Sequence, residues 1–537
     1  MSLSVRPIMT QQFVTKIGRI DAGEKVTQTL PVMLFPQYRQ QHALMSPVPL
    51  ALIQGIATYL AQYDNYCTEQ MISAAIPTLL FAQNKEYQPL FKTLSFVNDK
   101  QLSSANSAEI QTALDKLLSI LPSRQNEFGA YGVWNNLDVE GGFLTAYVSH
   151  FLIEAQERQV RLPKAWFGQY GLFNKTIEAL EAQSTEESEG SLSELRDRAY
   201  SAYLLTRLGQ VPSNALMSIR SALEHNFEPE DWQNDSSTAW LAAAYKMLKQ
   251  DDQANALIEF TLKQLNKPRK ENWAYENYND PLIKDSTMLY VITRHFPQHL
   301  NKVGDVVIER IAQDLNQQRY NTLSSAMVLL ALDAYGQHNQ AQVANLKIQV
   351  ANQDVDQDKG IFRLAELKDN QADVNFINQS QQPVWFALSQ QGYPQQADEK
   401  ALSNGLEIHR TYTDKDGKPV TSVKRGDVIN VTVKVRTASD FVSDIVITDL
   451  YPAGFEVIWQ SDVEEGETEY WSPTHYELRE DRIISYGDVG SESNTFVYQL
   501  KAVNAGTYQI PPAYAESMYD RSIKAYTAKE KQIKVEK

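Results

Sequence analysis

Cysteine occurs once in this chain of 537 residues, as Cys67, and Gln70 lies three positions after it. The segment that contains both reads Cys-Thr-Glu-Gln. Residues three apart share one face of a helix, so a thiol and a primary amide at this spacing can be held together. The sulfur can then displace ammonia from the glutamine side-chain carbon and leave an internal thioester. That bond is an acyl donor, because an amine or hydroxyl can attack the carbon and expel the thiolate.

The residues around the cysteine predict a helix. Asp64 and Asn65 are good N-cap residues, so the helix is expected to start near Tyr66 and to end or kink at Pro77. A helix N-terminus favours negative charge, which lowers the cost of a Cys67 thiolate. The alternative is a small buried hydrophobic residue, as most free cysteines are. Glu followed by Gln at these offsets favours the reactive interpretation, since ordinary usage gives it only roughly a few times in a thousand.

Composition argues against several classes of function. The net charge of -16 and a pI near 5.1 argue against nucleic acid and anionic membranes as partners. One cysteine excludes a disulfide framework, and the His and Cys residues show no metal-ligand spacing, so no metal and no cofactor is expected. No apolar run is long enough to span a bilayer. The opening MSLSVRPIMTQQF lacks the apolar core of a signal peptide, and we expect a fragment of a longer protein.

The pattern along the chain predicts an α+β multidomain protein. Residues 9–48 are strand-like, 49–340 carry apolar residues at helical spacing, and 341–395 return to strands. This order suggests a helical domain inserted in one β domain. Similar helices return at intervals of roughly 40 to 55 residues, which suggests helix pairs in a ring or solenoid. Residues 396–537 predict an antiparallel sandwich, with VKRGDVINVTVKVRT as a half-buried strand.

The CTEQ segment resembles the thioester motif of the alpha-2-macroglobulin and complement family. Its surroundings resemble the bacterial alpha-2-macroglobulins over essentially the whole chain, most clearly in PVPLALIQGIATYLAQYDNYCTEQ, GGFLTAYVSHFLIEA, VKRGDVINVTVKVRT and PPAYAESMYDRSIKAYT. One departure precedes the cysteine. Bacterial relatives commonly have Tyr-Pro-Tyr-Gly there, whereas this chain has Tyr63, Asp64, Asn65 and Tyr66.

The resemblance implies an architecture and a function. The architecture is an α/α toroid thioester domain, 49–340, inserted in a CUB-like β domain formed by 9–48 and 341–395, with a macroglobulin-like β-sandwich at 396–537. The function is that of a broad-spectrum protease trap, an inhibitor and not an enzyme, of which this chain is the C-terminal part. Cleavage of an upstream bait segment would expose the thioester, and surface lysines of the protease would be acylated.

The resemblance also implies partners and a location. The partners are attacking proteases and a penicillin-binding protein, and the expected state is a monomer. The full-length protein is expected in the periplasm, lipid-anchored to the cell envelope.

A thioester open to water would hydrolyse, so the chain must supply cover. Tyr63 and Tyr66 are near in sequence, and the resemblance implies that Met518 and Tyr519 of ESMYD pack over the site as a lock between domains. The alternative for that pair is ordinary sandwich core. For Glu69 three roles stay open: a helix cap, a contact that orients the glutamine amide, or a solvated surface carboxylate.

Some complement relatives transfer the acyl group first to a histidine. Here His150 falls within the apolar stretch FLTAYVSHFLIEA, and no histidine occurs between about 180 and 200. We therefore expect His150 to be a core or helix-face residue and amines to attack the thioester directly.

Two other classes of function stay open. One is an α/α-toroid carbohydrate-active enzyme with an appended β-sandwich, in which Trp134, Trp240 and Trp273 would line a sugar-binding cleft. Against it, the chain has no paired-carboxylate motif of defined geometry, and such tryptophans also pack between helix pairs. The other is a structural or adhesive β-domain protein in which Cys67 is merely buried. Intact mass and thiol titration separate these two classes from the first hypothesis. Only a thioester makes the chain one ammonia lighter than its sequence mass and removes its titratable thiol.

Overall fold

The structure is a computed structural model that describes residues 7, 11–61, 63, 66–81, 87, 90, 107–186, 190–265, 267, 269, 275–338, 345–368, 373–395, 400–458, 473–528 and 532–537. Contacts between residues divide the chain into two compact units. The helical unit comprises Phe13–Leu30 and Gln40–Gln390, and the C-terminal unit comprises Met1–Gln12, Pro31–Arg39 and Gln391–Lys537.

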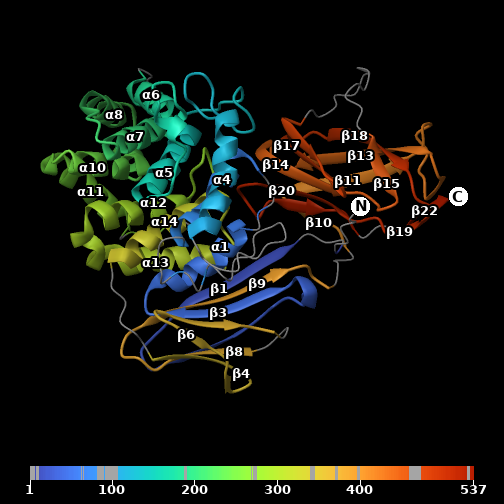
Figure 1. The fold of residues 1–537 in the computed structure, drawn as a ribbon, viewed down its shortest axis with the longest axis horizontal. Helices are drawn as coiled ribbons and strands as arrows, with labels where there is room; N and C mark the ends of the chain where they lie inside the picture. The colour runs from blue at the N-terminus through green and yellow to red at the C-terminus, as the bar shows by residue number, and fades with distance from the viewer. Residues whose placement is uncertain are drawn as a thin grey trace. The chain divides into compact units, whose positions relative to one another are not determined.

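Strands from both sides of the helical block pair within the same two sheets. Their bounds are Gln12–Ile20 (β1), Lys25–Thr29 (β2), Gln40–Ser46 (β3), Leu346–Val350 (β4), Gln353–Asp354 (β5), Gln357–Lys359 (β6), Phe362–Glu366 (β7), Asp373–Asn378 (β8) and Val384–Gly392 (β9). One sheet has the order β1-β9-β3-β7-β6 and the other β2-β8-β4-β5. Early strands, blue in Figure 1, thus pair with late ones, yellow to orange, so the helices are inserted between strands of one β region.

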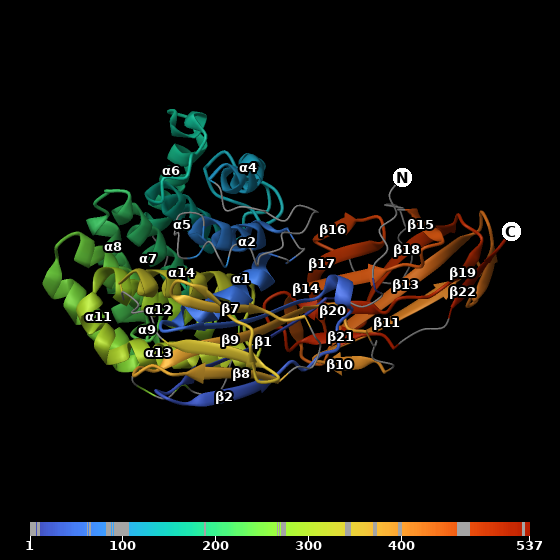
Figure 2. The same ribbon diagram turned by 60° about the horizontal axis from the view of Figure 1, so that its bottom comes forward.

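The five-stranded sheet lies between the helices and the second sheet. Phe13 and Ile17 of β1 belong to the core formed with the helices, whereas Ile20 belongs to the core between the two sheets. The layering is visible in Figure 2, where β1, β7 and β9 lie nearer the helices than β2 and β8 do. β1 is an edge strand, and Asn316 satisfies its free backbone: the Ile17 N–H donates to Asn316 Oδ1 at 2.8 Å, and Asn316 Nδ2 donates to the Ile17 carbonyl at 2.7 Å.

The helices fall into an inner and an outer set. The inner helices are Thr68–Phe81 (α2), Phe143–Glu157 (α5), Leu192–Arg207 (α7), Ser236–Met247 (α10), Pro281–His295 (α12) and Thr322–His338 (α14). They are rich in small residues and buried on nearly all sides, as in α10, where every residue from Ser236 to Tyr245 is buried. Each inner helix contacts the next, and α14 contacts α2, so the contacts close a ring.

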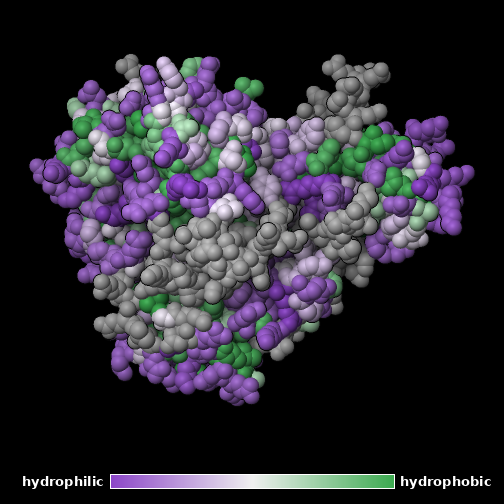
Figure 3. Space-filling view, in the orientation of Figure 1, coloured by the Kyte–Doolittle hydropathy of each residue, from purple (hydrophilic) through white to green (hydrophobic). Residues whose placement is uncertain are grey.

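The outer helices cover that ring, and most of them are amphipathic, but the first is buried from Ile53 to Leu60. Their bounds are Ile53–Ala61 (α1), Ser107–Arg124 (α4), Leu172–Thr185 (α6), Ser213–Asn226 (α8), Asp251–Leu265 (α11) and Leu300–Asn316 (α13), with the short helix Pro229–Trp232 (α9) and 3₁₀ turns at Pro36–Tyr38 (η1), Pro49–Leu52 (η2), Lys164–Phe167 (η3) and Pro297–His299 (η4). α4 packs on α2, α6 on α7, α11 on α10 and α13 on α12. Hydrophilic colours predominate over the helices in Figure 3. No helix in the described part of the chain has both the length and the apolar character needed to cross a membrane.

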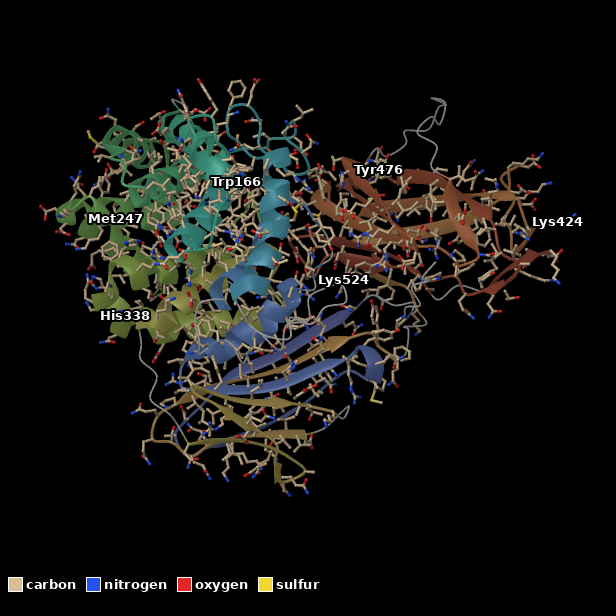
Figure 4. The ribbon with its side chains drawn as sticks, in the orientation of Figure 1. Trp166, Met247, His338, Lys424, Tyr476 and Lys524 are labelled. Carbon is tan, nitrogen blue, oxygen red and sulfur yellow. The ribbon has the colours of Figure 1, made fainter. Side chains whose placement is uncertain are left out.

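The C-terminal unit consists of β-sheets around a separate core. Its strands are Leu402–Asn404 (β10), Leu406–Thr413 (β11), Ser422–Lys424 (β12), Val428–Thr437 (β13), Phe441–Leu450 (β14), Phe455–Ile458 (β15), His475–Leu478 (β16), Arg482–Gly490 (β17), Asn494–Ala502 (β18), Gly506–Tyr508 (β19), Ala513–Ser517 (β20), Lys524–Tyr526 (β21) and Ile533–Glu536 (β22). The sheet orders are β10-β21-β20-β14-β17-β16, β11-β13-β18-β15 and β12-β22-β19. Lys424 of β12 and Tyr476 of β16 belong to different sheets (Figure 4).

The alternation seen in the sequence explains this sandwich. In β13 the side chains of Ile429, Val431, Val433 and Val435 are buried in the core, while most of their neighbours are not. The predicted half-buried strand is therefore confirmed over 428–437, whereas Val423 and Lys424 at the start of the same stretch belong to β12 in another sheet. The order of strands, helices and antiparallel sheets is also confirmed. The bounds predicted for the four domain segments stay predictions.

The first prediction concerns a buried ion pair of the C-terminal unit. Arg410 has a fully buried side chain that donates to Asp449 and to the Pro511 carbonyl. Arg410→Met leaves the buried Asp449 carboxylate without its cation, and we expect the free energy of unfolding to fall by about 3–5 kcal/mol in urea denaturation.

The matched control is Arg436→Met. Arg436 pairs with Glu407 in the same sheet, but its side chain is 55% exposed, so its loss should cost less than about 1 kcal/mol. Equal losses in the two variants would show that Arg410 does not stabilise this core.

Candidate functional site

Cys67 occupies the N-cap position of α2. The helix begins at Thr68, and the Cys67 carbonyl accepts its first backbone hydrogen bond from the Met71 N–H at 3.0 Å. The start lies close to the one predicted, and the helix continues through Pro77 instead of ending there. The predicted caps, Asp64 and Asn65, lie outside the described residues.

Three of the other inner helices have a side chain at this position that caps the first turn, whereas α5, which contacts α2, has Gly142 there and no such cap. Ser191 caps α7, Asp235 caps α10 and Asp280 caps α12, each by accepting an N–H of the first turn. α2 has the reverse contact: the Cys67 N–H donates to Gln70 Oε1 at 3.4 Å. A side chain three residues into the helix that reaches back to the N-cap N–H forms half of a capping box. This local preference folds the glutamine back toward the cysteine.

The two polar atoms of the Gln70 amide differ in their surroundings. Gln70 is 1% exposed, and its Nε2 is a buried atom without a hydrogen-bond partner in the described structure. An unpaired buried donor costs about 1–3 kcal/mol. Departure of that nitrogen as ammonia would remove the cost, while the oxygen that accepts from Cys67 would be kept. The surroundings therefore favour condensation with Cys67, which is itself fully buried.

Thr68 fastens the first turn of α2 to a neighbouring segment. Its N–H donates to the Val133 carbonyl at 2.9 Å, and its Oγ1 donates to the Gly132 carbonyl at 2.7 Å. Arg124, the last residue of α4, bridges the same region, because it donates to the Val133 carbonyl at 2.9 Å and to the Tyr66 carbonyl at 3.3 Å. Residues on both sides of the cysteine are thus held by this segment.

Glu69 is buried, with 1% of the residue exposed. Its carboxylate accepts the Ser73 hydroxyl at 2.5 Å and the Thr322 hydroxyl at 2.8 Å. The Ser73 oxygen also lies 2.8 Å from the Tyr147 hydroxyl. Burial, and then the negative charge of Glu69, raise the pKa of Tyr147 well above its ordinary value. Of the three roles left open for Glu69, the solvated surface carboxylate is wrong.

The two tyrosines before the motif have different surroundings. Tyr63 is half-buried, and its ring meets Tyr59 edge-on with the centroids 5.6 Å apart. Tyr66 is 40% exposed. Their role in shielding stays a prediction.

Met518 and Tyr519 follow β20 directly in the C-terminal unit. Both are buried, and the Met518 N–H donates to the Asp444 carbonyl at 2.9 Å. They belong to a different compact unit from Cys67, so the lock between domains also stays a prediction.

His150 is a core residue, as expected. It is 1% exposed, its Nδ1 lies 2.6 Å from the Tyr200 hydroxyl, and its Nε2 lies 3.0 Å from the Tyr290 hydroxyl. Burial lowers the pKa of His150 to about 4, so the ring is neutral near pH 7. With both ring nitrogens engaged, it is not free to accept an acyl group.

Sequence reasoning missed the ionic cluster next to His150. Glu154 is buried and accepts from Arg207 and Arg294, both at 2.9 Å. Burial acts to raise the pKa of Glu154, but the nearby His150, whose Nε2 lies 3.6 Å from Oε1, and the two arginine charges hold it well below its usual range. The sequence signal that could have revealed this cluster is a charged residue near the end of otherwise apolar helical stretches, as at Glu154, Arg207 and Arg294. Within the described ranges, no group of three or more His, Cys, Asp or Glu side chains is placed to hold a metal ion.

Trp240 does not offer a sugar-binding face. It is 3% exposed and stacks against both Tyr200 and Tyr203, with centroid distances of 4.6 and 4.8 Å. A platform for a sugar needs an open aromatic face, so Trp240 has the packing role. Trp134 is half-buried, and Trp273 lies outside the described residues.

Comparison with known proteins shows which proteins this chain is similar to. Residues 405–521 match the family model for the Bacterial Alpha-2-macroglobulin MG10 domain. Over all 537 residues the chain is 61% identical to an alpha-2-macroglobulin of Pasteurella multocida (strain Pm70). In sequence this chain is a counterpart of part of the bacterial alpha-2-macroglobulins. It spans 28% of the length of the Pasteurella alpha-2-macroglobulin.

Two solved alpha-2-macroglobulins share the fold. The native Escherichia coli protein from domain MG7 to the C-terminus matches with a TM-score of 0.80 and 23% identity, covering 99% of this chain and 83% of that one. A Salmonella alpha-2-macroglobulin reacted with methylamine matches with a TM-score of 0.79 and 23% identity, covering 100% of this chain and 34% of that one. The helices and antiparallel sheets are therefore those of the C-terminal region of the family.

The second prediction tests the segment that holds Cys67. Arg124→Met removes two hydrogen bonds from a charged donor, each contributing about 1.5–3 kcal/mol. Local opening should become easier. After treatment of both proteins with methylamine, iodoacetamide should alkylate Cys67 of the variant at least about tenfold faster than Cys67 of the wild type.

Arg220→Met is the control, because Arg220 is partly exposed and pairs with Glu224 in its own helix. If Arg124→Met and Arg220→Met alkylate at the wild-type rate, the Arg124 bridge does not protect the cysteine.

Proposed function

We propose that this chain carries an internal thioester between Cys67 Sγ and Gln70 Cδ, and that it is the acylating part of a protease trap. The observation that carries the proposal is the buried Gln70 amide, whose oxygen contacts the Cys67 N–H and whose nitrogen has no partner among the described residues. Formation joins sulfur to the amide carbon and releases ammonia, with the thiol proton leaving on the nitrogen.

Capture follows from the chemistry of that bond. An amine nitrogen adds to the Gln70 carbon, the carbon–sulfur bond breaks, and an isopeptide-type amide remains after the amine loses a proton. The Cys67 thiolate departs at the N-terminus of α2, where the helix dipole favours negative charge. The bond is consumed once and not regenerated, so the chain is an inhibitor and not an enzyme.

Similarity to the bacterial alpha-2-macroglobulins supports the rest of the mechanism. Cleavage of a bait segment elsewhere in the full-length protein exposes the thioester, and lysines on the attacking protease supply the amines. His150 has both ring nitrogens engaged and is buried, which supports direct attack by amines over a histidine intermediate. The Salmonella relative reacted with methylamine supports a small amine as the probe.

The finer architecture forms part of the proposal. The closed ring of inner-helix contacts supports an α/α toroid thioester domain. The pairing of β2 with β8 and of β3 with β7 supports its insertion in a CUB-like β domain. The MG10 match supports a macroglobulin-like sandwich at the end of the chain.

Shielding and cellular context follow from the resemblance alone. Met518 and Tyr519 form the lock over the thioester, with Tyr63 and Tyr66 on the side of the motif. The full-length protein is a monomer in the periplasm, lipid-anchored to the cell envelope, with a penicillin-binding protein as a partner.

The third prediction is covalent labelling at one residue. Isotope-labelled methylamine should be incorporated at Gln70, as peptide mapping by mass spectrometry will show, and glycerol should label far more slowly. Cys67→Ser should abolish the labelling, because no thiolate can then leave. Absence of label from freshly purified wild type, or equal label in Cys67→Ser, contradicts the proposal.

The fourth prediction tests the lock. Tyr519→Ala and Met518→Ala should both raise the rate of methylamine incorporation, since each removes apolar cover from an acyl bond that water and amines otherwise cannot reach. Tyr476→Ala, on a residue 40% exposed in the same unit, is the control and should leave the rate unchanged. Wild-type rates in both lock variants would rule the lock out.

A further inference from the structure

The thioester chemistry leaves one residue of the motif unused. Cys67 and Gln70 form the bond, and Thr68 fastens the turn to the Gly132 and Val133 carbonyls. Glu69 takes part in neither, yet its charged side chain is buried. Burying a carboxylate is costly unless hydrogen bonds compensate, so its place requires donors.

The hydrogen bonds around Glu69 have a defined direction. A carboxylate only accepts, so Ser73 and Thr322 donate their single hydroxyl protons to its two oxygens. With the Ser73 proton committed, the Tyr147 hydroxyl donates to the Ser73 oxygen. Three hydroxyl groups are thus ordered around one carboxylate. Bonds to a charged acceptor are the stronger class of hydrogen bond.

The donors come from three different inner helices. Ser73 lies in α2 itself, Thr322 is the first residue of α14, and Tyr147 lies in α5. Glu69 lies in the first turn of α2, where a negative charge suits the helix dipole. The carboxylate therefore ties the start of α2 to both neighbours in the ring, directly before Gln70.

We infer that Glu69 is a positioning residue for the thioester. This inference rests on the function proposed above. The hydrogen bonds of Glu69 to Thr322 and, through Ser73, to Tyr147 fix the first turn of α2. That turn holds the Gln70 carbon within reach of the Cys67 sulfur, both when ammonia is displaced and when an amine attacks. The carboxylate does not touch the reacting atoms. A misplacement of about 1 Å can slow a reaction roughly a hundredfold, so loss of these bonds should be seen in the chemistry.

The decisive experiment removes the hydroxyl group and the methyl group of Thr322 in two separate variants. Thr322→Val keeps the shape but removes the hydroxyl that donates to Glu69, whereas Thr322→Ser keeps the hydroxyl and removes the methyl group. The measurements are the fraction of chains that have lost ammonia, by intact mass, and the rate of methylamine incorporation at Gln70. Thermal unfolding is followed in parallel for both variants.

Positioning by Glu69 predicts opposite behaviour in the two variants. Thr322→Val should form the thioester in a smaller fraction of chains or react with methylamine about tenfold more slowly, and Thr322→Ser should match the wild type. A packing role for Thr322 predicts the reverse order, because only serine lacks the methyl group. Tyr147→Phe, which removes the distal donor, should give a smaller loss of the same kind.

The outcomes separate this inference from the function on which it rests. A wild type that takes up no methylamine overturns both. A wild type that reacts, together with a Thr322→Val variant that reacts equally fast and completely, overturns the positioning role and leaves the thioester intact. Loss in Thr322→Val with full activity in Thr322→Ser supports the role.

Discussion

Exclusion of water from Cys67 and Gln70 is the constraint on which this account depends. An acyl bond to sulfur survives only where water does not reach it, and the two side chains are 0% and 1% exposed. The burial comes from the position of α2, an inner helix that contacts α14 on one side and α5 on the other and is covered by α4. The same closure that builds the core of the helical unit thus creates the dry place that the chemistry needs.

That constraint explains why the first turn of α2 has a cysteine at the N-cap position instead of a capping side chain. Three other inner helices are preceded by Ser191, Asp235 or Asp280, whose side chains cap the first turn. Such caps bring stability but no acyl chemistry. α2 instead has a cysteine at the cap position, and the stabilising contacts are moved to Thr68 and Glu69. The Gln70 nitrogen, which has no partner among the described residues, is the remaining local cost, and it is the atom that the proposed condensation would remove.

The parts of the site that were predictable are those determined over a few residues. The spacing of Cys67 and Gln70 predicted that the two residues lie together in one turn, where the Cys67 N–H donates to Gln70 Oε1, and the alternation over 428–437 predicted a strand whose apolar face is buried. The role of Glu69 was not predictable, because its partner Thr322 lies 253 positions away and becomes a neighbour only when the ring closes. The cluster of Glu154 with Arg207 and Arg294 was missed for the same reason. Stacking of Tyr200 and Tyr203 against Trp240 likewise depends on a neighbouring helix, so its apparent fit to a sugar cleft could not be judged from the sequence.

The intact mass of freshly purified protein tests the central claim most directly. The account predicts a chain one ammonia lighter than its sequence, which gains exactly one methylamine on treatment and then shows a titratable sulfhydryl. A chain of full sequence mass, whose single cysteine titrates completely before any treatment, would contradict the thioester and with it the capture mechanism.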